Sequence, residues 1–407
     1  MEMKVHKRIL IPIKEEKHKY KEDTSFGTSI MMVNTTYTKK DGLHLLQLYS
    51  EEVASDTSGK CFQRTSKDNG KTWSNPILVF EPQETEEGVI RWGESCLFLD
   101  EGKECIFHFY NLHLYPKNIF SREVQEYTRI FYRISFDEGK TFSNGKQIIQ
   151  KGFNETNWAE DVIYGKNSIA ISFCAPLKLN SGKILLPCQK VPLEHKGDNP
   201  FLISYVAGCF IGEWKGQEIE WELSQMVKID PQLSSRGLCE PTIAQLYNGE
   251  LLMIMRGSNY TIPSVPGYKW FSISKDSGYT WSSPTPLKYD TGENFFSPAT
   301  GSRLIRSTKN KKLYWIGNIV KENPDGNRPR YPLQIAEVDE EKKAIKKHTV
   351  NIIEDKRESD SPFVQFSNFR VYEDRETGEF VLIMARIQER GEKDLSSPAY
   401  EYRIEVL

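Results

Sequence analysis

The sequence predicts an all-β protein built from repeated units, and three observations support this. Short runs rich in Val, Ile, Phe, Tyr and Trp alternate with gaps rich in Gly, Asn, Asp and Pro along the 407 residues, as expected of strands and turns. Helical periodicity is almost absent, and the one candidate helical turn lies at residues 339–346. A short motif also recurs at near-constant spacing, which is typical of repeat architectures.

The recurring motif begins with Ser-x-Asp and ends with Gly-x-Thr and an aromatic residue. It reads SKDNGKTW at Ser66–Trp73, SFDEGKTF at Ser135–Phe142 and SKDSGYTW at Ser274–Trp281. The first two copies start about 69 residues apart, and the third starts about twice that distance further on. Degenerate copies at residues 205–221 and 335–345 continue the series. About six units of roughly 65–70 residues therefore account for the chain.

Each motif predicts a hairpin turn that is held by its own side chains, and not a catalytic site. Asp68, Asp137 and Asp276 can accept hydrogen bonds from backbone amides within the turn. The glycine two residues after each aspartate can adopt a positive φ. The aromatic ring that ends the motif is then expected to pack between neighbouring sheets.

Composition and charge exclude several classes of protein. The formal net charge is −2, which argues against a strongly basic nucleic-acid-binding protein. No apolar run is long enough to span a membrane, and the short run at residues 9–13 lacks the features of a secretory signal. We therefore expect a cytoplasmic protein with no nucleic-acid or membrane partner. The sequence does not predict the oligomeric state.

The cysteines and histidines show no metal-binding pattern. The 7 cysteines form no CxxC pair and lie in apolar contexts, so we expect buried, reduced thiols. The 7 histidines show no HExxH spacing, and no phosphate-binding glycine loop is present,. We therefore expect neither a metal ion nor an organic cofactor.

The three motifs resemble the Asp-box, or BNR, repeats of the sialidase (neuraminidase) superfamily. In that family the repeats lie on the outer turns of a six-bladed β-propeller, in which each blade is a four-stranded antiparallel sheet. The resemblance implies the same fold here, as a single sialidase-like domain over residues 1–407. It also implies a glycan or glycoconjugate substrate, and an exo-glycoside hydrolase that removes an acidic sugar of the sialic acid or uronic acid type.

The resemblance extends to residues 240–259, EPTIAQLYNGELLMIMRGSN. In sialidases a glutamate at the start of such a run polarises the nucleophile, and an arginine after the strand helps to clamp the substrate carboxylate. Glu240 and Arg256 match these places. The later stretch GNRPRYPLQ resembles the strand that is led by another clamp arginine, which points to Arg330, with Arg328 as the alternative.

The general acid of sialidases is an aspartate on the loop before the first Asp box. In this chain Asp56 lies in that loop, and Glu51 and Glu52 are its competitors. Near neutral pH such an acid must be held protonated, which burial beside apolar rings can achieve.

The chain departs from the family at two places. The stretch SFGTSIMMV at Ser25–Val33 lacks the first clamp arginine, and Phe366 falls where the nucleophilic tyrosine is expected. A phenyl ring cannot attack an anomeric carbon, so the sequence favours an inverting route in which water attacks. Glu240 and Asp56 would then form the acid/base pair, and Tyr331 is the candidate substitute for the missing nucleophile.

Polar residues also precede the hydrophobic runs that would form the innermost strands of several blades. RWGES at residues 91–95 is one example, and aromatic residues beside such motifs can cover the flat faces of a sugar ring. The predicted substrate-binding residues are Arg256, Arg330, Arg91, Glu94, Arg236, Trp92, Asn259 and Tyr268.

Two other functions fit the same residues. A non-catalytic carbohydrate-binding propeller would account for the missing arginine and tyrosine, and Glu240 would then only anchor Arg256. A polysaccharide lyase would need a base that acts on a uronic acid, for which His108, His113 and His195 are candidates.

Overall fold

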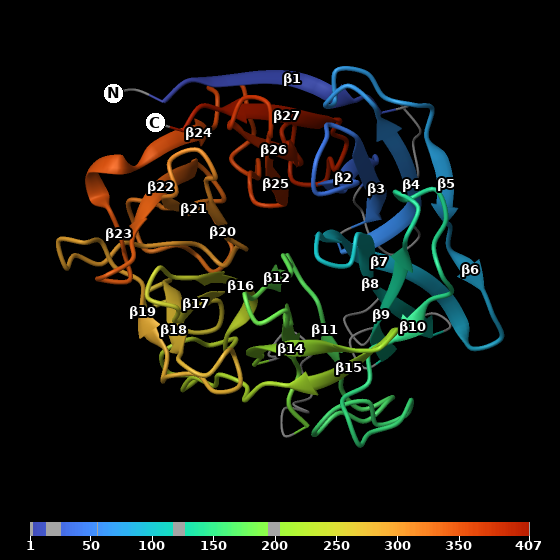
Figure 1. Ribbon diagram of the computed structural model, residues 1–407. Coiled ribbons are helices and arrows are strands. Elements are labelled where there is room, and N and C mark those ends of the chain that lie inside the picture. The colour runs from blue at the N-terminus through green and yellow to red at the C-terminus, as the bar shows by residue number, and fades with distance from the viewer. Residues whose placement is uncertain (1–2, 14–25, 55, 117–126, 194–203, 407) are drawn as a thin grey trace.

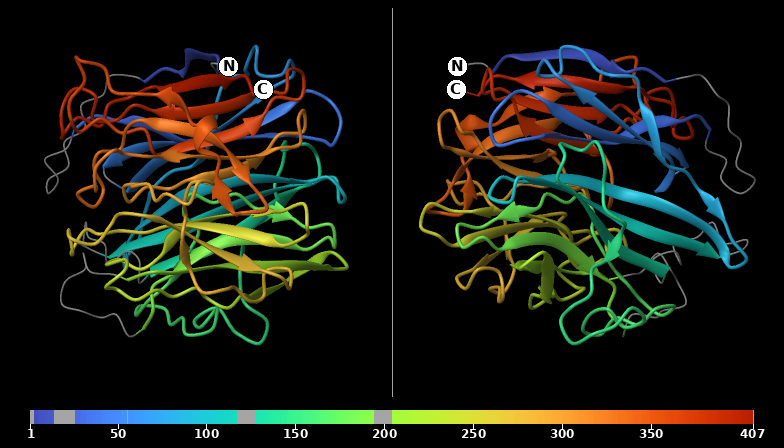
Figure 2. Two further views of the ribbon diagram at one scale, coloured as in Figure 1. Left: turned by 90° about the vertical axis from the view of Figure 1, so that its left-hand side faces the viewer. Right: turned by 45° about the vertical axis from the view of Figure 1, so that its right-hand side comes forward.

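The computed structural model describes residues 3–13, 26–54, 56–116, 127–193 and 204–406. Within these residues the strands form six antiparallel sheets that are arranged as a ring (Figure 1). Side views show the strands running between the two faces of this ring (Figure 2). The fold is a six-bladed β-propeller, as the sequence predicts.

The first three blades follow one another along the chain, and each is given from its innermost strand outward. The first blade contains β2 (Ser29–Tyr37), β3 (Leu45–Ala54), β4 (Thr57–Ser66) and β5 (Ile77–Phe80). The second contains β7 (Gly88–Asp100), β8 (Cys105–Pro116), β9 (Thr128–Ser135) and β10 (Lys146–Gln147), with β6 (Gln83–Glu84) paired to β7. The third contains β11 (Ile169–Ala170), β12 (Leu177–Lys178), β13 (Ile184–Lys190), β14 (Val206–Lys215) and β15 (Glu218–Leu223).

The last three blades complete the ring in the same order. The fourth contains β16 (Cys239–Gln245), β17 (Leu251–Arg256), β18 (Lys269–Ser274) and β19 (Thr285–Pro286). The fifth contains β20 (Arg303–Arg306), β21 (Leu313–Asn318), β22 (Leu333–Asp339), β23 (Ala344–Ile345) and β24 (Asn351–Glu354). The sixth contains β25 (Phe369–Glu373), β26 (Phe380–Ala385), β27 (Ala399–Ile404) and β1 (Val5–Ile11).

The ring is closed by strands from both ends of the chain. β1 pairs with β27 in antiparallel register, from Val5 opposite Ile404 to Ile11 opposite Ala399. Figure 1 shows β1 lying along the outside of the sixth blade, with the N- and C-terminal ends near each other. Because a closed ring protects the edges of its sheets, this pairing stabilises the whole propeller.

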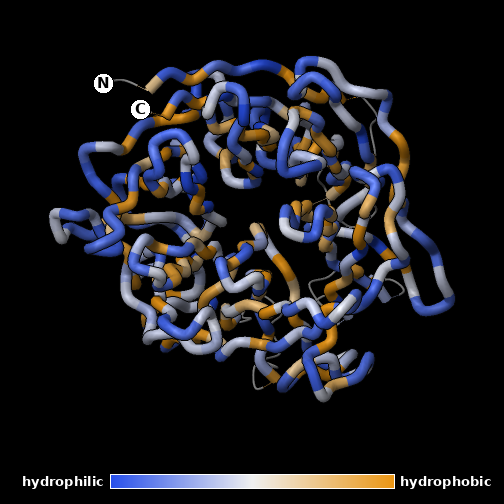
Figure 3. The backbone as a smooth tube through the Cα atoms, in the orientation of Figure 1, coloured by the Kyte–Doolittle hydropathy of each residue, from blue (hydrophilic) through white to orange (hydrophobic). Residues whose placement is uncertain are grey.

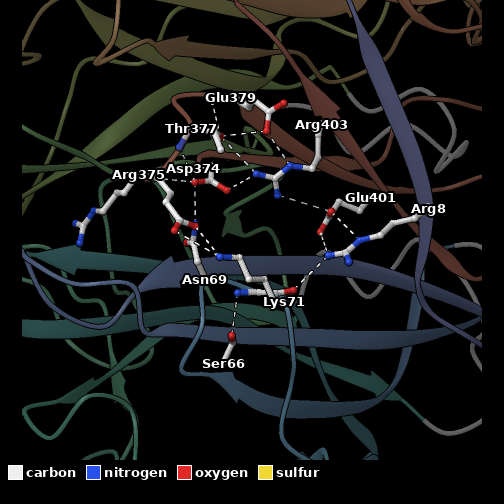
Figure 4. Close-up of polar contacts among 12 residues, drawn as sticks. Arg8, Ser66, Asn69, Lys71, Asp374, Arg375, Thr377, Glu379, Glu401 and Arg403 are labelled. Carbon is white, nitrogen blue, oxygen red and sulfur yellow. Dashed lines mark hydrogen bonds and ion pairs between the residues drawn. The ribbon is translucent and has the colours of Figure 1, made fainter.

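Where the ring closes, a polar network joins the sixth blade to the first (Figure 4). Asn69 Nδ2 of the first Asp box donates to Asp374 Oδ1 at 2.8 Å, and Asp374 is ion-paired with Arg403 of β27. Arg8 of β1 bonds Glu401 of β27 through its Nε at 2.9 Å. The first Asp box therefore helps to stabilise the closed ring through its contact with the sixth blade.

The three Asp boxes have the turn geometry that the sequence predicts. In the first, Asp68 Oδ1 accepts the Thr72 amide N–H at 2.8 Å and Oδ2 accepts the Thr72 hydroxyl at 2.6 Å. Hydrogen bonds from Thr72, side chain and backbone, lower the pKa of Asp68 to about 2. Asp137 and Asp276 make the same contacts with the threonine four residues later. Gly70, with φ of 79°, supplies the left-handed conformation,.

The interior of the ring consists of apolar side chains packed between neighbouring blades. Trp281, which ends the third Asp box, is 8% exposed and packs in a cluster with Leu185 and Cys209 of the preceding blade. This confirms the predicted packing between sheets for that ring. Hydrophobic residues gather inside the blades, and the peripheral turns are largely hydrophilic (Figure 3). All seven cysteines are buried and free.

The predicted helical turn at residues 339–346 is wrong. This stretch forms the β22–β23 turn, in which Asp339 Oδ1 accepts the amide N–H groups of Glu341 and Lys342 at 3.1 and 2.9 Å. The aspartate stabilises a tight turn in place of a helix, and only a 3-10 turn at Lys347–Thr349 follows,. Among the described residues, no helix has the length and apolarity needed to cross a membrane.

The antiparallel order of the strands separates two faces of the ring. The Asp boxes follow the third strand of their blades and lie on one face, here called the Asp-box face. The innermost strands β2, β7, β16, β20 and β25 begin at the opposite face, here called the site face, where the β3–β4 turn also lies.

Three innermost strands, β2, β7 and β16, bulge at an equivalent place close to the site face, and the segment after β11 has a similar backbone there. Each has a non-glycine residue with positive φ there: Met32 (51°), Glu94 (48°), Phe173 (54°) and Glu240 (48°). The register shifts next to Met32, Glu94 and Glu240 mark β-bulges. A bulge re-aims a side chain, and left-handed non-glycine residues cluster at functional sites. The bulges therefore indicate a functional site close to this face.

Candidate active site

The centre of the candidate site is a buried ion pair between Glu240 and Arg256. Glu240 lies in the bulge of β16, and Arg256 is the last residue of β17. Arg256 Nη1 donates to Glu240 Oε1 at 2.5 Å, and the two side chains are 13% and 16% exposed. Although burial opposes the charged form, the Glu240 carboxylate raises the pKa of Arg256. Glu240 Oε2 is buried and has no hydrogen-bond partner within the described part of the chain.

Asn327 connects this pair to Arg330, which precedes β22. Arg256 Nη2 donates to Asn327 Oδ1 at 3.2 Å, and Arg330 Nε donates to the Asn327 carbonyl at 3.2 Å. Arg330 Nη1 also donates to Gln365 Oε1 at 2.6 Å. Burial and the nearby Arg256 lower the pKa of Arg330 to about 10, so both arginines are charged at neutral pH.

The alternative clamp residue Arg328 makes different contacts. It donates to the Phe363 carbonyl at 2.8 Å and to Gln388 Oε1 at 3.1 Å. Its guanidinium also lies over the Phe363 ring, 4.9 Å from the centroid. Asn327 therefore links Arg330 to Arg256, whereas Arg328 binds the sixth blade.

Lys269 lies beside the pair on the neighbouring strand and was not predicted. It is opposite Arg256 in the β17–β18 register and is completely buried. Its Nζ donates to the Pro298 carbonyl at 3.0 Å and to both oxygens of Thr300. Burial lowers the pKa of Lys269 to about 7. A lysine within an apolar strand was the only signal for it in the sequence.

The β3–β4 turn contributes the candidate acids. Asp56 is exposed at the tip of this turn with φ of 55°, and its carbonyl accepts the Tyr115 hydroxyl at 3.3 Å. Glu52 is buried beneath the tip, where its Oε1 accepts the Thr57 amide N–H at 3.2 Å. Burial, followed by the charges of Asp56 and Glu94, raises the pKa of Glu52 well above its usual value.

Glu94 and Arg370 form a second ion pair, between β7 and β25. Arg370 Nη2 donates to Glu94 Oε2 at 3.2 Å, and the same oxygen accepts the Phe173 amide N–H at 3.2 Å. Burial raises the pKa of Glu94, and Glu240 and Asp56 act in the same direction. The charges of Glu240 and Asp56 also act on Arg330, where they oppose the lowering of its pKa by burial. These carboxylates and arginines therefore share one electrostatic environment at the site face.

Arg370 lies close to the stretch at residues 25–33 that lacks the first clamp arginine. Ser25, at the start of the stretch that lacks it, lies outside the described residues, but β2 begins at Ser29. Arg370 Nη2 lies 2.9 Å from Met32 Sδ in the bulge of β2. Phe366, in the expected place of the tyrosine, is completely buried, with Arg386 over its ring at 4.7 Å.

Several predicted residues have structural contacts near the site face. Arg91 Nη1 donates to the Ser58 carbonyl at 2.8 Å, and Trp92 stacks on Phe80 with ring centroids 5.0 Å apart. Arg236 lies over the Tyr205 ring at 5.9 Å. Their roles in binding substrate stay predictions.

Three further predicted residues belong to the blade packing. Asn259 is completely buried, and its side chain binds the backbone of residues 265, 324 and 326, so it supports the loop that holds Asn327. Tyr268 stacks on Phe296 with centroids 6.0 Å apart. Tyr331 packs against the apolar cluster of the fifth and sixth blades.

Two of the three histidines considered as bases, His108 and His113, lie in β8 of the second blade. His108 is completely buried and its ring contacts Ser95 and Arg133, each at 3.0 Å. Burial lowers the pKa of His108 and brings that of His113 to about 4. His195 lies outside the described residues. Throughout the described ranges, no group of three or more His, Cys, Asp and Glu side chains is arranged to hold a metal ion.

The repeat, the fold and the site face agree with a known family. Residues 63–361 match the family model of the BNR repeat-like domain, so the chain belongs to this family. No curated protein sequence matches the chain.

Solved sialidases share the fold at low sequence identity. The NanB sialidase of Streptococcus pneumoniae is 12% identical with a TM-score of 0.61, and the match covers 94% of this chain and 69% of NanB. The intramolecular trans-sialidase of Ruminococcus gnavus is 11% identical with a TM-score of 0.59, covering 91% and 93%. The Trypanosoma rangeli sialidase is 13% identical with a TM-score of 0.61, covering 98% of this chain and 58% of that one. At such identities the likeness shows the fold alone.

Proposed function

We propose that this protein is a sialidase-like exo-glycoside hydrolase that removes an acidic sugar, of the sialic acid or uronic acid type. The observation that carries the proposal is the pair of charged arginines, Arg256 and Arg330, which Asn327 links beside the Glu240 carboxylate. Paired guanidinium groups bind a carboxylate with directed, charge-assisted hydrogen bonds.

The ligands of two structural neighbours agree with an acidic substrate. The Ruminococcus gnavus trans-sialidase was solved with oseltamivir carboxylate, and the Trypanosoma rangeli sialidase with a difluoro-nononic acid. Both ligands carry an acid group by name. This supports an acidic sugar as the substrate of the present chain, and its paired arginines give the physical reason for binding one.

We further propose an inverting reaction. The unpartnered Glu240 Oε2 accepts a proton from the attacking water, and Asp56 donates a proton to the leaving-group oxygen. Phe366 cannot replace a nucleophilic tyrosine because a phenyl ring has no reactive oxygen. Tyr331 is the substitute nucleophile if the configuration is instead retained.

Hydrolysis of aryl glycosides tests the function. A panel of sialyl and uronyl glycosides is incubated with the wild type, with Glu240→Gln and with Glu250→Gln as matched control. Glu250 belongs to the same blade but binds Lys275 and Lys343 on the Asp-box face. We expect release of the aglycone that Glu240→Gln reduces by about 10³-fold or more and that Glu250→Gln leaves unchanged.

The products separate the remaining possibilities. Inversion of the released sugar, followed by NMR, supports attack by water, and retention would implicate a nucleophile such as Tyr331. If no glycoside is cleaved, the hydrolase proposal fails. Saturable sugar binding in calorimetry would then support a carbohydrate-binding propeller.

A further inference from the structure

A cavity of about 180 Å³ lies in the central channel, separate from the Glu240 pair. Its wall is formed by the innermost segments of five blades, including residues 33–35, 96–97, 174–176, 303–305 and 370–372. In β2 and β7 these residues follow the bulges at Met32 and Glu94, and after β11 they follow Phe173, which also has a positive φ. The cavity is therefore displaced from the site face toward the Asp-box face.

Two buried arginines line this cavity with incomplete hydrogen bonding. Arg303 begins β20 and is 4% exposed, and Arg370 is the second residue of β25 and is 5% exposed. Arg303 Nη2 donates to the Cys174 carbonyl at 3.0 Å, and Arg370 Nη1 donates to the Phe369 carbonyl at 3.1 Å. Arg303 Nε, Arg303 Nη1 and Arg370 Nε are buried and find no partner among the residues described.

The charges around the cavity do not balance. Both guanidinium groups lie over the Phe173 ring, at 5.4 and 4.9 Å from its centroid. Glu94 is the carboxylate that pairs with Arg370, and no salt bridge joins Arg303 to a carboxylate of the described chain. Burial and the neighbouring Arg370 lower the pKa of Arg303 to about 10, so it is still charged at neutral pH.

The other polar wall groups do not supply the missing negative charge. Burial raises the pKa of the Cys174 thiol well above its usual value, so this cysteine is neutral, and Asn34 carries no charge. An unpaired charge in a protein interior is costly, as is an unpaired buried donor. One negative charge inside the cavity would relieve both costs.

We propose that this cavity binds one small monovalent anion, such as chloride, between Arg303 and Arg370. A water molecule takes about 30 Å³ in the liquid, so the cavity has room for a hydrated halide. The anion accepts the free N–H groups of the two arginines and neutralises the excess charge. Because the wall combines segments of five blades, the bound anion holds the innermost strands together.

Anion-dependent unfolding and crystallography test the proposal. The protein is transferred to gluconate, an anion much larger than a halide, and chloride or bromide is then titrated at constant ionic strength. We expect a saturable rise in Tm with chloride, and an anomalous bromide peak in the cavity of a soaked crystal. The peak distinguishes this cavity from the arginines around Glu240.

Variants of one strand supply the control. Arg303→Gln removes the guanidinium in the cavity, whereas Arg306→Gln removes the one on β20 that binds Glu340. We expect Arg303→Gln to weaken the apparent chloride affinity by about 30-fold or more, and Arg306→Gln to leave it unchanged. Absence of bromide from the wild-type cavity overturns the proposal, and this result does not require Arg303→Gln to fold. An equal chloride response of both variants overturns it as well.

Discussion

Glu240 has two features that cost free energy in a folded protein, a strained backbone and a buried oxygen without a partner in the described chain, beside its ion pair with Arg256. Its φ is 48°, its Oε2 is buried without a partner in the described chain, and its other oxygen is held by Arg256 at 2.5 Å. Strained and under-bonded residues persist where the surrounding structure over-determines them, commonly at functional sites. The free oxygen is therefore best explained as a group reserved for a water or a substrate.

The assignment of Asp56 as general acid predicts a dependence on the leaving group. Asp56→Asn should slow cleavage of glycosides with poor leaving groups by about 10²–10⁴-fold. Activated nitrophenyl glycosides should lose much less, because their leaving groups need little protonation. Steady-state kinetics on a leaving-group series measures this, with Glu101→Gln in the β7–β8 turn as control. If Glu52→Gln shows this pattern and Asp56→Asn does not, the buried carboxyl is the acid.

Lys269 predicts an unusual pH dependence of stability. Its pKa is lowered from 10.5 to about 7 in the folded state, so between these values the unfolded chain binds more protons. The free energy of unfolding of the wild type should therefore rise with pH, relative to Lys269→Met, by up to about 1.4 kcal/mol per pH unit. Below about pH 7 both the folded and the unfolded chain bind this proton, so the difference between the two proteins no longer changes with pH.

Urea denaturation at pH 6 to 10 measures the difference between the two proteins. Lys275→Met is the control, because Lys275 belongs to the same blade but its side chain is 79% exposed. Its difference from the wild type should stay constant over the same range. Parallel curves for the wild type and Lys269→Met would show that Lys269 remains charged.

The two faces of the propeller differ in the local structure of their strands and turns. On the Asp-box face, the side chains of short turns bind the backbone N–H groups of the same turn. The aromatic ring that ends the third Asp box packs against the neighbouring blade. At the site face, bulges in the innermost strands re-aim side chains such as Glu94 and Glu240,. The regular outer turns therefore stabilise the ring, and the irregular inner strands are available for binding and chemistry.

The Asp box of the second blade predicts a test of contact between blades. A Cβ on Gly139 would lie 2.6 Å from Leu46 of the first blade, whereas a Cβ on Gly152 would meet nothing within 4 Å. Both glycines have similar φ, 83° and 87°, so alanine costs about 1 kcal/mol of backbone strain at each. Gly139→Ala should lose about 1–3 kcal/mol more in urea denaturation. Equal losses would show that Leu46 moves aside freely.

Sequence reasoning predicts these elements unevenly, for a physical reason. The Asp boxes can be predicted because Asp68 binds Thr72, only four residues away. Glu240 and Arg256 also lie in one hairpin, so a local resemblance locates both. Arg370 meets Glu94 across 276 residues, and no local pattern announces such a contact. The bulges are equally hidden, because no common sequence pattern surrounds Met32, Glu94 and Glu240.

The whole molecule depends on closing a ring from strands at opposite ends of the chain. β1 and β27 supply the backbone pairing, and Asp374 joins it to the first Asp box (Figure 4). Burial opposes ionisation of Asp374, but its hydrogen bonds with Arg403 and Asn69 lower its pKa. The carboxylate therefore stabilises the closed ring as long as it is charged.

Replacing this carboxylate should weaken closure in a pH-dependent way. At pH 7, Asp374→Asn should lower the free energy of unfolding by about 3 kcal/mol, because Arg403 loses a buried partner. Since the folded pKa is depressed, the stabilisation is complete above the unfolded value near 4 and is lost as pH falls through the folded value. The gap between the wild type and Asp374→Asn should therefore narrow in acid. Glu376→Gln, which breaks the more exposed pair with Lys71, should cost less than about 1 kcal/mol. If both variants lose the same stability in urea denaturation, the buried pair contributes no more to closure than a surface contact does.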